Sequence, residues 1–316
     1  MRAKPLARSP AHRPLPPRLS SPNPRPQHDD PYVRRITSET LAHVAAKDIG
    51  AADLVASGAV QALIRRLHDD DAPVAAAAFN TLEATVAWVS GRTGLAGTRS
   101  ALGALVALLA DEREADGRLH QALRVLRATL AVDHNDDAIA QIAVRASGVP
   151  VICALLAAPR PAAVRNAAAH VLAALCAGSP EAAAAAVAAG AVPHLSAMLH
   201  AGPYDARLAA SAALGYVTVI LPGKHAVKGC KPDAIMMLIR LLAVSDETLC
   251  ENLLQVVANV AELPANRKEL RAQLALPALD ELAAGEGALL MRERALAVVD
   301  GVKFQHHPHP VKRYIS

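Results

Sequence analysis

Apolar residues recur along this chain at helical spacing, in stretches that follow short breaks containing glycine. Two such stretches have the apolar positions Val60, Leu63, Ile64 and Leu67, and Val192, Leu195, Met198 and Leu199. Steps of three and four residues place these side chains on one face of a helix. The pattern predicts a series of amphipathic helices whose apolar faces pack against neighbouring helices.

The glycine breaks themselves form a repeat. The segment Ser57-Gly58-Ala59-Val60 returns as Ser147-Gly148-Val149-Pro150 and as Ala189-Gly190-Ala191-Val192, with a period in the low forties along the chain. That period is typical of armadillo and HEAT repeats. Because glycine enters a left-handed turn at no steric cost, we predict units of one short helix, a sharp turn and two longer antiparallel helices. The expected fold is all-α, an armadillo/HEAT-like right-handed α-solenoid of about six repeats.

Composition agrees with closely packed helices. The chain is 53% hydrophobic and only 2% aromatic, so small side chains must fill most of the core. We expect a solenoid at 37–303, a disordered Pro/Arg-rich tail at 1–36 and a flexible His-containing tail at 304–316. Pro and Gly interrupt the long uncharged stretches, which predicts a soluble intracellular chain with no membrane partner.

Charge and motifs exclude several kinds of function. The net charge is +4, part of it in the N-terminal tail, and the few aromatic residues are scattered, which disfavours nucleic acid as a partner. The sequence lacks catalytic motifs, so we expect no enzyme, no cofactor and no small-molecule substrate.

Candidate chemical groups have simpler structural interpretations. Asp69 to Asp71 are expected to cap the next helix, and the glycine-dense stretch Ser90 to Gly94 is expected to connect two helices. His306, His307 and His309 lie in a proline-broken tail, and no metal site is expected there. The cysteines lack ligand spacing and are expected to be buried free thiols: Cys153, Cys176, Cys230 and Cys250.

The third helix of each unit is where a partner would bind, because in an armadillo solenoid these helices line the concave groove. Arg165 and Arg207 occupy the same repeat position and could receive acidic side chains of a partner. Charge reversal at both should then weaken binding in the groove, whereas solvated arginines would show no effect. Asn259 resembles the groove asparagine that holds a peptide backbone, although the Asn and Trp ladder of nuclear-import receptors is missing. The candidate groove residues are Arg165, Asn166, His170, Arg207, Ser211, Asn252, Gln255 and Asn259.

Three segments resemble one family more specifically. They are Val86 to Leu95, Tyr216 to Ala226 and Val257 to Leu270, which contain a Gly-Arg-x-Gly loop, a Gly-Lys loop and a Pro-x-x-Arg-Lys turn. Their order and spacing are similar to the radial spoke head protein 14 homologue family, also called rhabdoid tumour deletion region protein. The similarity runs from about Pro31 to Phe304, and the two tails depart from it.

This resemblance implies a non-enzymatic structural subunit of the ciliary axoneme, a radial spoke component whose partners are other spoke proteins. The implied location is the cytoskeleton of the cilium or flagellum. The alternative is a cytosolic armadillo adaptor, such as a ubiquitin-ligase-associated scaffold. The first thirty-six residues are too short and too rich in proline for the U-box that such ligases carry.

Overall fold

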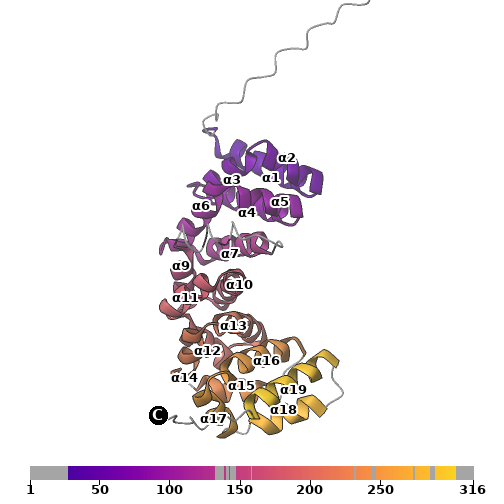
Figure 1. Ribbon diagram of the computed structural model, residues 1–316. Helices are drawn as coiled ribbons and strands as arrows, with labels where there is room; N and C mark the ends of the chain where they lie inside the picture. Colours follow the sequence, from indigo (N-terminus) through magenta and orange to yellow (C-terminus); the bar gives the residue numbers. More distant parts are fainter. Residues whose placement is uncertain are drawn as a thin grey trace, which may run out of the picture.

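The computed structural model describes residues 28–131, 147–157, 159–230, 233–242, 247–272, 275–284 and 289–303, together with Ile139 and Ile142. Within these residues the regular elements are helices, which stack into one elongated column (Figure 1). The all-α solenoid is confirmed. The predicted tail up to residue 27 and the tail from residue 304 lie outside the described residues.

Each unit contains up to three described helices. The short first helices are α2 (Asp48–Ala56), α5 (Val89–Gly97), α11 (Pro180–Ala188), α14 (Leu221–Lys228) and α17 (Pro264–Ala272). The second helices are α3 (Ala59–Arg66), α6 (Arg99–Ala110), α9 (Gly148–Ala154), α12 (Ala191–Ala201), α15 (Ala234–Leu242) and α18 (Ala275–Ala284).

The third helices form a continuous row, which we call the third-helix ladder. Its members are α1 (Pro31–Ala45), α4 (Ala72–Val86), α7 (Asp116–Leu130), α10 (Ala162–Gly178), α13 (Tyr204–Val217), α16 (Glu247–Ala261) and α19 (Leu289–Lys303). Each member contacts the next along the column. A ligand that crosses several units would therefore meet a regular series of helix faces.

One hydrophobic core runs through the stack. The apolar positions of the predicted stripes are buried, including Leu63, Leu67, Leu195 and Leu199 at 0% exposure. The middle helices α10 and α13 bury several alanines, so their backbones approach closely, as the composition predicted. All four cysteines are buried free thiols, as predicted, and burial raises the pKa of Cys153 and Cys176 to about 12.

The first helix begins earlier than expected. We predicted a solenoid from residue 37, whereas α1 begins at Pro31. The reason is local: Asp30 caps the helix by accepting a hydrogen bond from the Tyr32 amide at 2.9 Å, and proline is favoured in the first turn. Tertiary contacts hold α1 in place, since Arg34 donates two hydrogen bonds of 2.8 Å to Asp69. Among the described residues, the helical column therefore begins with a third helix.

The predicted glycine turns are confirmed in two units. Gly58 and Gly190 have φ of 74° and precede α3 and α12. In the α9 unit, one of the two that lie between them, the left-handed residue is Ser147, with φ of 50°, and Gly148 already belongs to α9. The repeated glycine segment thus predicts the position of the turn, but it does not predict which residue adopts the left-handed conformation.

Candidate partner-binding groove

Three hollows follow the third-helix ladder. One lies between α1 and α4, with a volume of about 300 Å³. A second, of about 450 Å³, is lined by α7, α10 and the start of α13. A third, of about 390 Å³, is lined by α13, α16 and α19. The groove expected on this side of the solenoid is therefore present as a row of depressions.

The middle depression combines a cationic rim with an apolar floor, and we call it the basic hollow. Its polar lining consists of His120, Arg124 and Arg127 from α7, Asn166 and His170 from α10, and Asp205 from α13. The floor is formed by Leu123, Ala163, Ala167 and Leu208. Two predicted residues, Asn166 and His170, thus come together with four polar residues that were not predicted.

One of the two arginines of the basic hollow has an ion pair within the fold, and Asp205 adds a negative charge to the lining. Arg124 lies 3.5 Å from Glu83 of α4. Arg127 is exposed and forms no ion pair among the described residues. Burial lowers the pKa of His170, and the positive charge of Arg127 lowers it further, against the opposing effect of Asp205. Arg127 is therefore the arginine of this hollow that remains available to a negatively charged group of a ligand.

The hollow between α13, α16 and α19, which we call the C-terminal hollow, differs in this respect. Asn252 donates to the Ser211 hydroxyl at 3.3 Å, and Arg294 lies 3.6 Å from Glu251. Gln255 donates to the side-chain Oδ1 atom of Asn259 at 3.0 Å. Polar groups here bind one another across neighbouring helices.

The peptide-holding role suggested by the position of Asn259 does not fit its contacts. Asn259 is only 7% exposed, and its amide donates to the Gly215 carbonyl at 2.8 Å and the Thr218 hydroxyl at 3.2 Å. Both polar ends of its side chain are thus engaged within the fold. Asn259 joins α16 to the end of α13, and a bound peptide would have to break these bonds.

Arg165 and Arg207 occupy equivalent places in the first turns of α10 and α13, as predicted. Both are half-buried, and neither lines a hollow described above, although their neighbours Asn166 and Leu208 line the basic hollow. The Nε atoms of both arginines are buried without a hydrogen-bond partner among the described residues. Their role in binding stays a prediction.

The three α7 residues were missed because the repeat step is longest between α6 and α9, which obscured the register of α7. A signal was nevertheless present. His120, Arg124 and Arg127 are spaced four and three residues apart, so they share one helix face. The buried positions of α7 leave that face toward the groove.

The segments that resembled a known family lie elsewhere, at the points where a third helix ends and the next first helix begins. We call these points elbows. At the elbow between α4 and α5, Trp88 donates to the Ala45 carbonyl at 3.1 Å, and Ser90 donates to Asp48 at 2.5 Å. The Ser90 to Gly94 stretch was wrongly expected to be a connection, since it belongs to α5. Its glycines are explained by close packing, as a side chain at Gly94 would overlap Val55.

Two of these segments contact each other directly. Lys224 of the Gly-Lys loop pairs with Glu262, which precedes the Pro-x-x-Arg-Lys turn. Asn266 of that turn donates to the Lys224 carbonyl at 3.3 Å and to the Val260 carbonyl at 3.2 Å. The Arg267 guanidinium donates to the Ala261 carbonyl at 2.7 Å. These motif residues join successive elbows.

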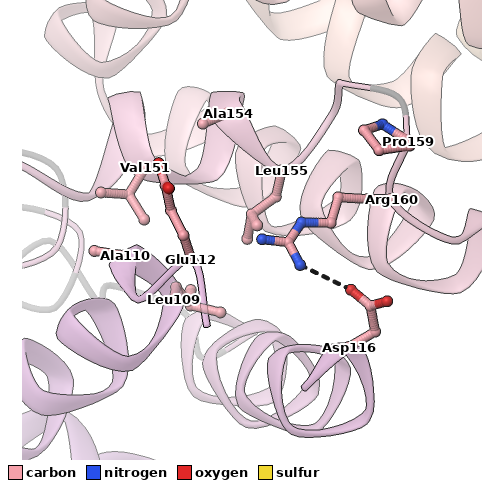
Figure 2. A pocket seen from close by; sticks show the side chains of 9 residues that line it. All are labelled: Leu109, Ala110, Glu112, Asp116, Val151, Ala154, Leu155, Pro159 and Arg160. Atoms are coloured by element: carbon pink, nitrogen blue, oxygen red, sulfur yellow. Dashed lines mark hydrogen bonds and ion pairs between the residues drawn. The ribbon is translucent and has the colours of Figure 1, made fainter. Parts of the chain in front are cut away.

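A further hollow of about 520 Å³ lies away from the ladder faces, between α6, α9 and the start of α7. Figure 2 shows Arg160 and Asp116 pointing toward each other across it, with an ion pair of 3.0 Å. Val151, Leu155 and Leu109 supply apolar lining. Arg160, the cation of its lining, is already paired, and Glu112 adds a further carboxylate, so this hollow offers less to a negatively charged ligand than the basic hollow does.

Other expectations bear on function less directly. Asp71 caps α4, as predicted, by accepting from the Val74 amide at 3.1 Å, whereas Asp69 is not a cap of that kind and pairs with Arg34. The described residues contain no group of three or more possible metal ligands, and the histidines near the C-terminus lie outside them. No single described helix is long and apolar enough to span a bilayer, although two sharply bent pairs reach that length together.

Comparison with known proteins gives one relative that matches along most of the chain. It is radial spoke protein 14 of Chlamydomonas reinhardtii, 32% identical over 286 residues, which cover 89% of this chain and 74% of the relative. No protein-family model matches the chain.

Solved structures support the fold alone, because their identities are low. A designed armadillo repeat protein has a TM-score of 0.68 at 20% identity and covers 77% of this chain and 99% of its own. Another designed armadillo repeat protein, solved in complex with a (KR)4 peptide, has a TM-score of 0.66 at 19% identity, with the same coverage. An engineered protein has a TM-score of 0.67 at 23% identity and covers 77% of this chain and 96% of its own.

Proposed function

The chain belongs to the radial spoke protein 14 family, and on that premise we propose that it is a non-enzymatic structural subunit of the radial spoke in the ciliary axoneme. The observation that carries the proposal is the 32% identity to a radial spoke protein over 89% of the chain. Similarity over 89% of the chain extends across most of the solenoid, so it concerns the solenoid as a unit and not one repeat.

The fold suits a scaffolding role. A column of stacked units offers long faces and two ends to neighbouring proteins. An ordinary protein interface buries about 1,600 Å² in total, and the chain exposes 18356 Å², so several contacts can coexist. We infer that neighbouring spoke proteins bind along the third-helix ladder, where Arg127 of the basic hollow has no ion pair among the described residues.

The test is to express the tagged chain in a ciliated cell, isolate axonemes and extract them with increasing salt. Mass spectrometry then identifies the proteins that co-migrate with the chain. Recovery with radial spoke subunits in a salt-resistant complex is the expected result. A chain found in the cytosol with ubiquitination machinery would reject the proposal and favour the adaptor alternative.

A further inference from the structure

We propose that the basic hollow binds a short acidic segment of a protein partner, about six residues long, laid across α7, α10 and α13. The inference rests on the proposed function, because it specifies what a neighbouring subunit would present to the ladder. The proposed ligand is a peptide that carries carboxylates. Its charged contacts are made by residues of α7, which the three family segments do not contain.

Charge sets the chemistry of the ligand. Arg124 and Arg127 stand one helical turn apart on the rim, and Arg127 forms no ion pair with any described residue. A guanidinium group binds a carboxylate through two parallel hydrogen bonds, so a row of arginines on one helix face favours a row of carboxylates. Asp205 is the one carboxylate of the lining, and it lies at the α13 end, away from the arginines of α7 along the ladder.

The floor sets the shape of the ligand. Leu123, Ala163, Ala167 and Leu208 present small and apolar surface between the charged groups. An apolar side chain flanked by carboxylates would fill this floor while its neighbours reach the rim. The lining contains the imidazole rings of His120 and His170 but no Phe, Tyr or Trp, which favours a peptide over a nucleic acid.

Asn166 supplies a contact for the backbone of such a segment. It lies in the lining, and its Oδ1 atom is buried without a hydrogen-bond donor among the described residues. A buried acceptor left unpaired is costly, so a main-chain N–H brought by the ligand would be favourable there. Asn259, which was expected to hold the peptide backbone, already donates its side-chain amide to the Gly215 carbonyl of α13.

The length of the segment follows from the ends of the hollow. On the far side of α13 the polar groups pair among themselves, through Asn252 with Ser211 and Arg294 with Glu251. On the α1 side, Arg35 pairs with Glu39 at 2.9 Å. Two steps between packed helices span about 20 Å, and an extended chain covers about 3.3 Å per residue, which gives about six residues.

The experiment measures binding of the full chain to fluorescein-labelled Glu-Asp-Leu-Glu-Asp-Leu by fluorescence anisotropy. The test variant is Arg124→Glu/Arg127→Glu. The matched control is Arg113→Glu/Lys268→Glu, which changes the net charge equally at exposed residues outside the hollow. Because Arg124 also contacts Glu83, the single variant Arg127→Glu is measured in parallel and its fold is checked by circular dichroism.

We expect the test variant to lose at least about tenfold in affinity and the control to change less than about twofold, since close charge pairs at interfaces dominate over distant ones. Binding should strengthen from a three-residue to a six-residue peptide and then level off at nine residues. The charge-reversed peptide Lys-Arg-Leu-Lys-Arg-Leu should not bind.

Several results would overturn the inference. Equal losses in the test and control variants would show a general charge effect, and tighter binding of a single-stranded oligonucleotide would assign the hollow to nucleic acid. If the wild-type chain co-purifies with spoke subunits but does not bind the acidic peptide, the inference fails and the proposed function stands. If the peptide binds at the hollow but the chain is absent from axonemes, the hollow stands and the proposed function fails.

Discussion

The elbows and the basic hollow belong to the same stack of helices, but their polar groups are arranged in opposite ways. At the elbows, side chains such as Trp88, Lys224 and Asn266 bind carbonyls or charges of the adjoining unit. In the basic hollow, Arg127 and the Oδ1 atom of Asn166 have no partner among the described residues. The difference indicates that the elbows hold the column together, whereas the hollow is left available for a ligand.

The comparison also separates family identity from binding. The three segments that resemble the radial spoke family lie at or next to elbows, and none of them contains a residue that lines the basic hollow. Elbow residues must satisfy fixed steric demands between units, so they repeat a recognisable pattern. The choice of groove residues depends on the partner that they bind, and the amino-acid sequence of one chain does not contain that partner.

The largest loss of stability is expected from adding a side chain to a closely packed glycine at an elbow. A Cβ atom on Gly223 would overlap the Val217 carbonyl oxygen, and Gly91 stands in the same relation to the Thr85 carbonyl. Because a backbone atom cannot move aside, Gly223→Ala should lower the free energy of unfolding by about 2–4 kcal/mol. Urea denaturation followed by circular dichroism measures it.

A matched glycine provides the control. Gly103 lies inside α6, and a Cβ atom there would meet nothing within 4 Å. Gly103→Ala should therefore raise stability by about 0.5–1 kcal/mol through helix propensity. An equal change in the free energy of unfolding for the two variants would show that the backbone around Gly223 relaxes and that this elbow does not constrain the stack.

The second effect concerns the hydrogen bonds that span two units. Asn259→Ala removes the donor to the Gly215 carbonyl and leaves buried groups unpaired, so it should destabilise the fold by about 1–3 kcal/mol. Asn80→Ala is the control, because Asn80 is exposed on α4. Thermal unfolding of both variants is the measurement, and a loss at Asn80 as large as at Asn259 would contradict an internal role for Asn259.

A smaller effect depends on pH. The hydrogen bond from Arg34 lowers the pKa of Asp69, so this carboxylate binds protons more weakly in the folded chain than in the unfolded one. Its contribution is therefore present above the unfolded pKa of about 4 and is lost as pH falls through the lower folded pKa. The stability difference between wild type and Asp69→Asn should shrink as the pH is lowered from 6 to about 3.

The pH experiment also distinguishes two kinds of contact. The overlap that excludes a side chain at Gly223 involves no titratable group, so the defect of Gly223→Ala should keep its size over the same range. Urea midpoints of both variants at each pH are compared with wild type. A pH-independent difference at Asp69 would show that the pair with Arg34 does not account for its contribution.

Sequence reasoning predicted the fold well and the site incompletely. Helical period and the glycine turns specified the units, because both are local properties of the chain, as Gly58 and Gly190 show. Asn259 was misjudged because its partners Gly215 and Thr218 lie one unit away, and pairing across units depends on the packing of helices. The α7 cations were missed because the long repeat step between α6 and α9 obscured the register of α7, although their spacing places them on one helix face.

The smallest effect on stability is expected at Arg165 and Arg207, which lie beside the basic hollow and, within the described part of the chain, lack the inter-unit bonds of the elbow residues. Their buried Nε donors have no partner among the described residues, so the fold gains little from the guanidinium groups. Arg165→Met/Arg207→Met keeps the apolar stem of each side chain and should change stability by less than about 0.5 kcal/mol. Co-purification with axonemal partners should nevertheless fall, because two cations beside the basic hollow are lost. A loss of stability as large as that of Asn259→Ala would mean that these arginines support the column in the way that elbow residues do.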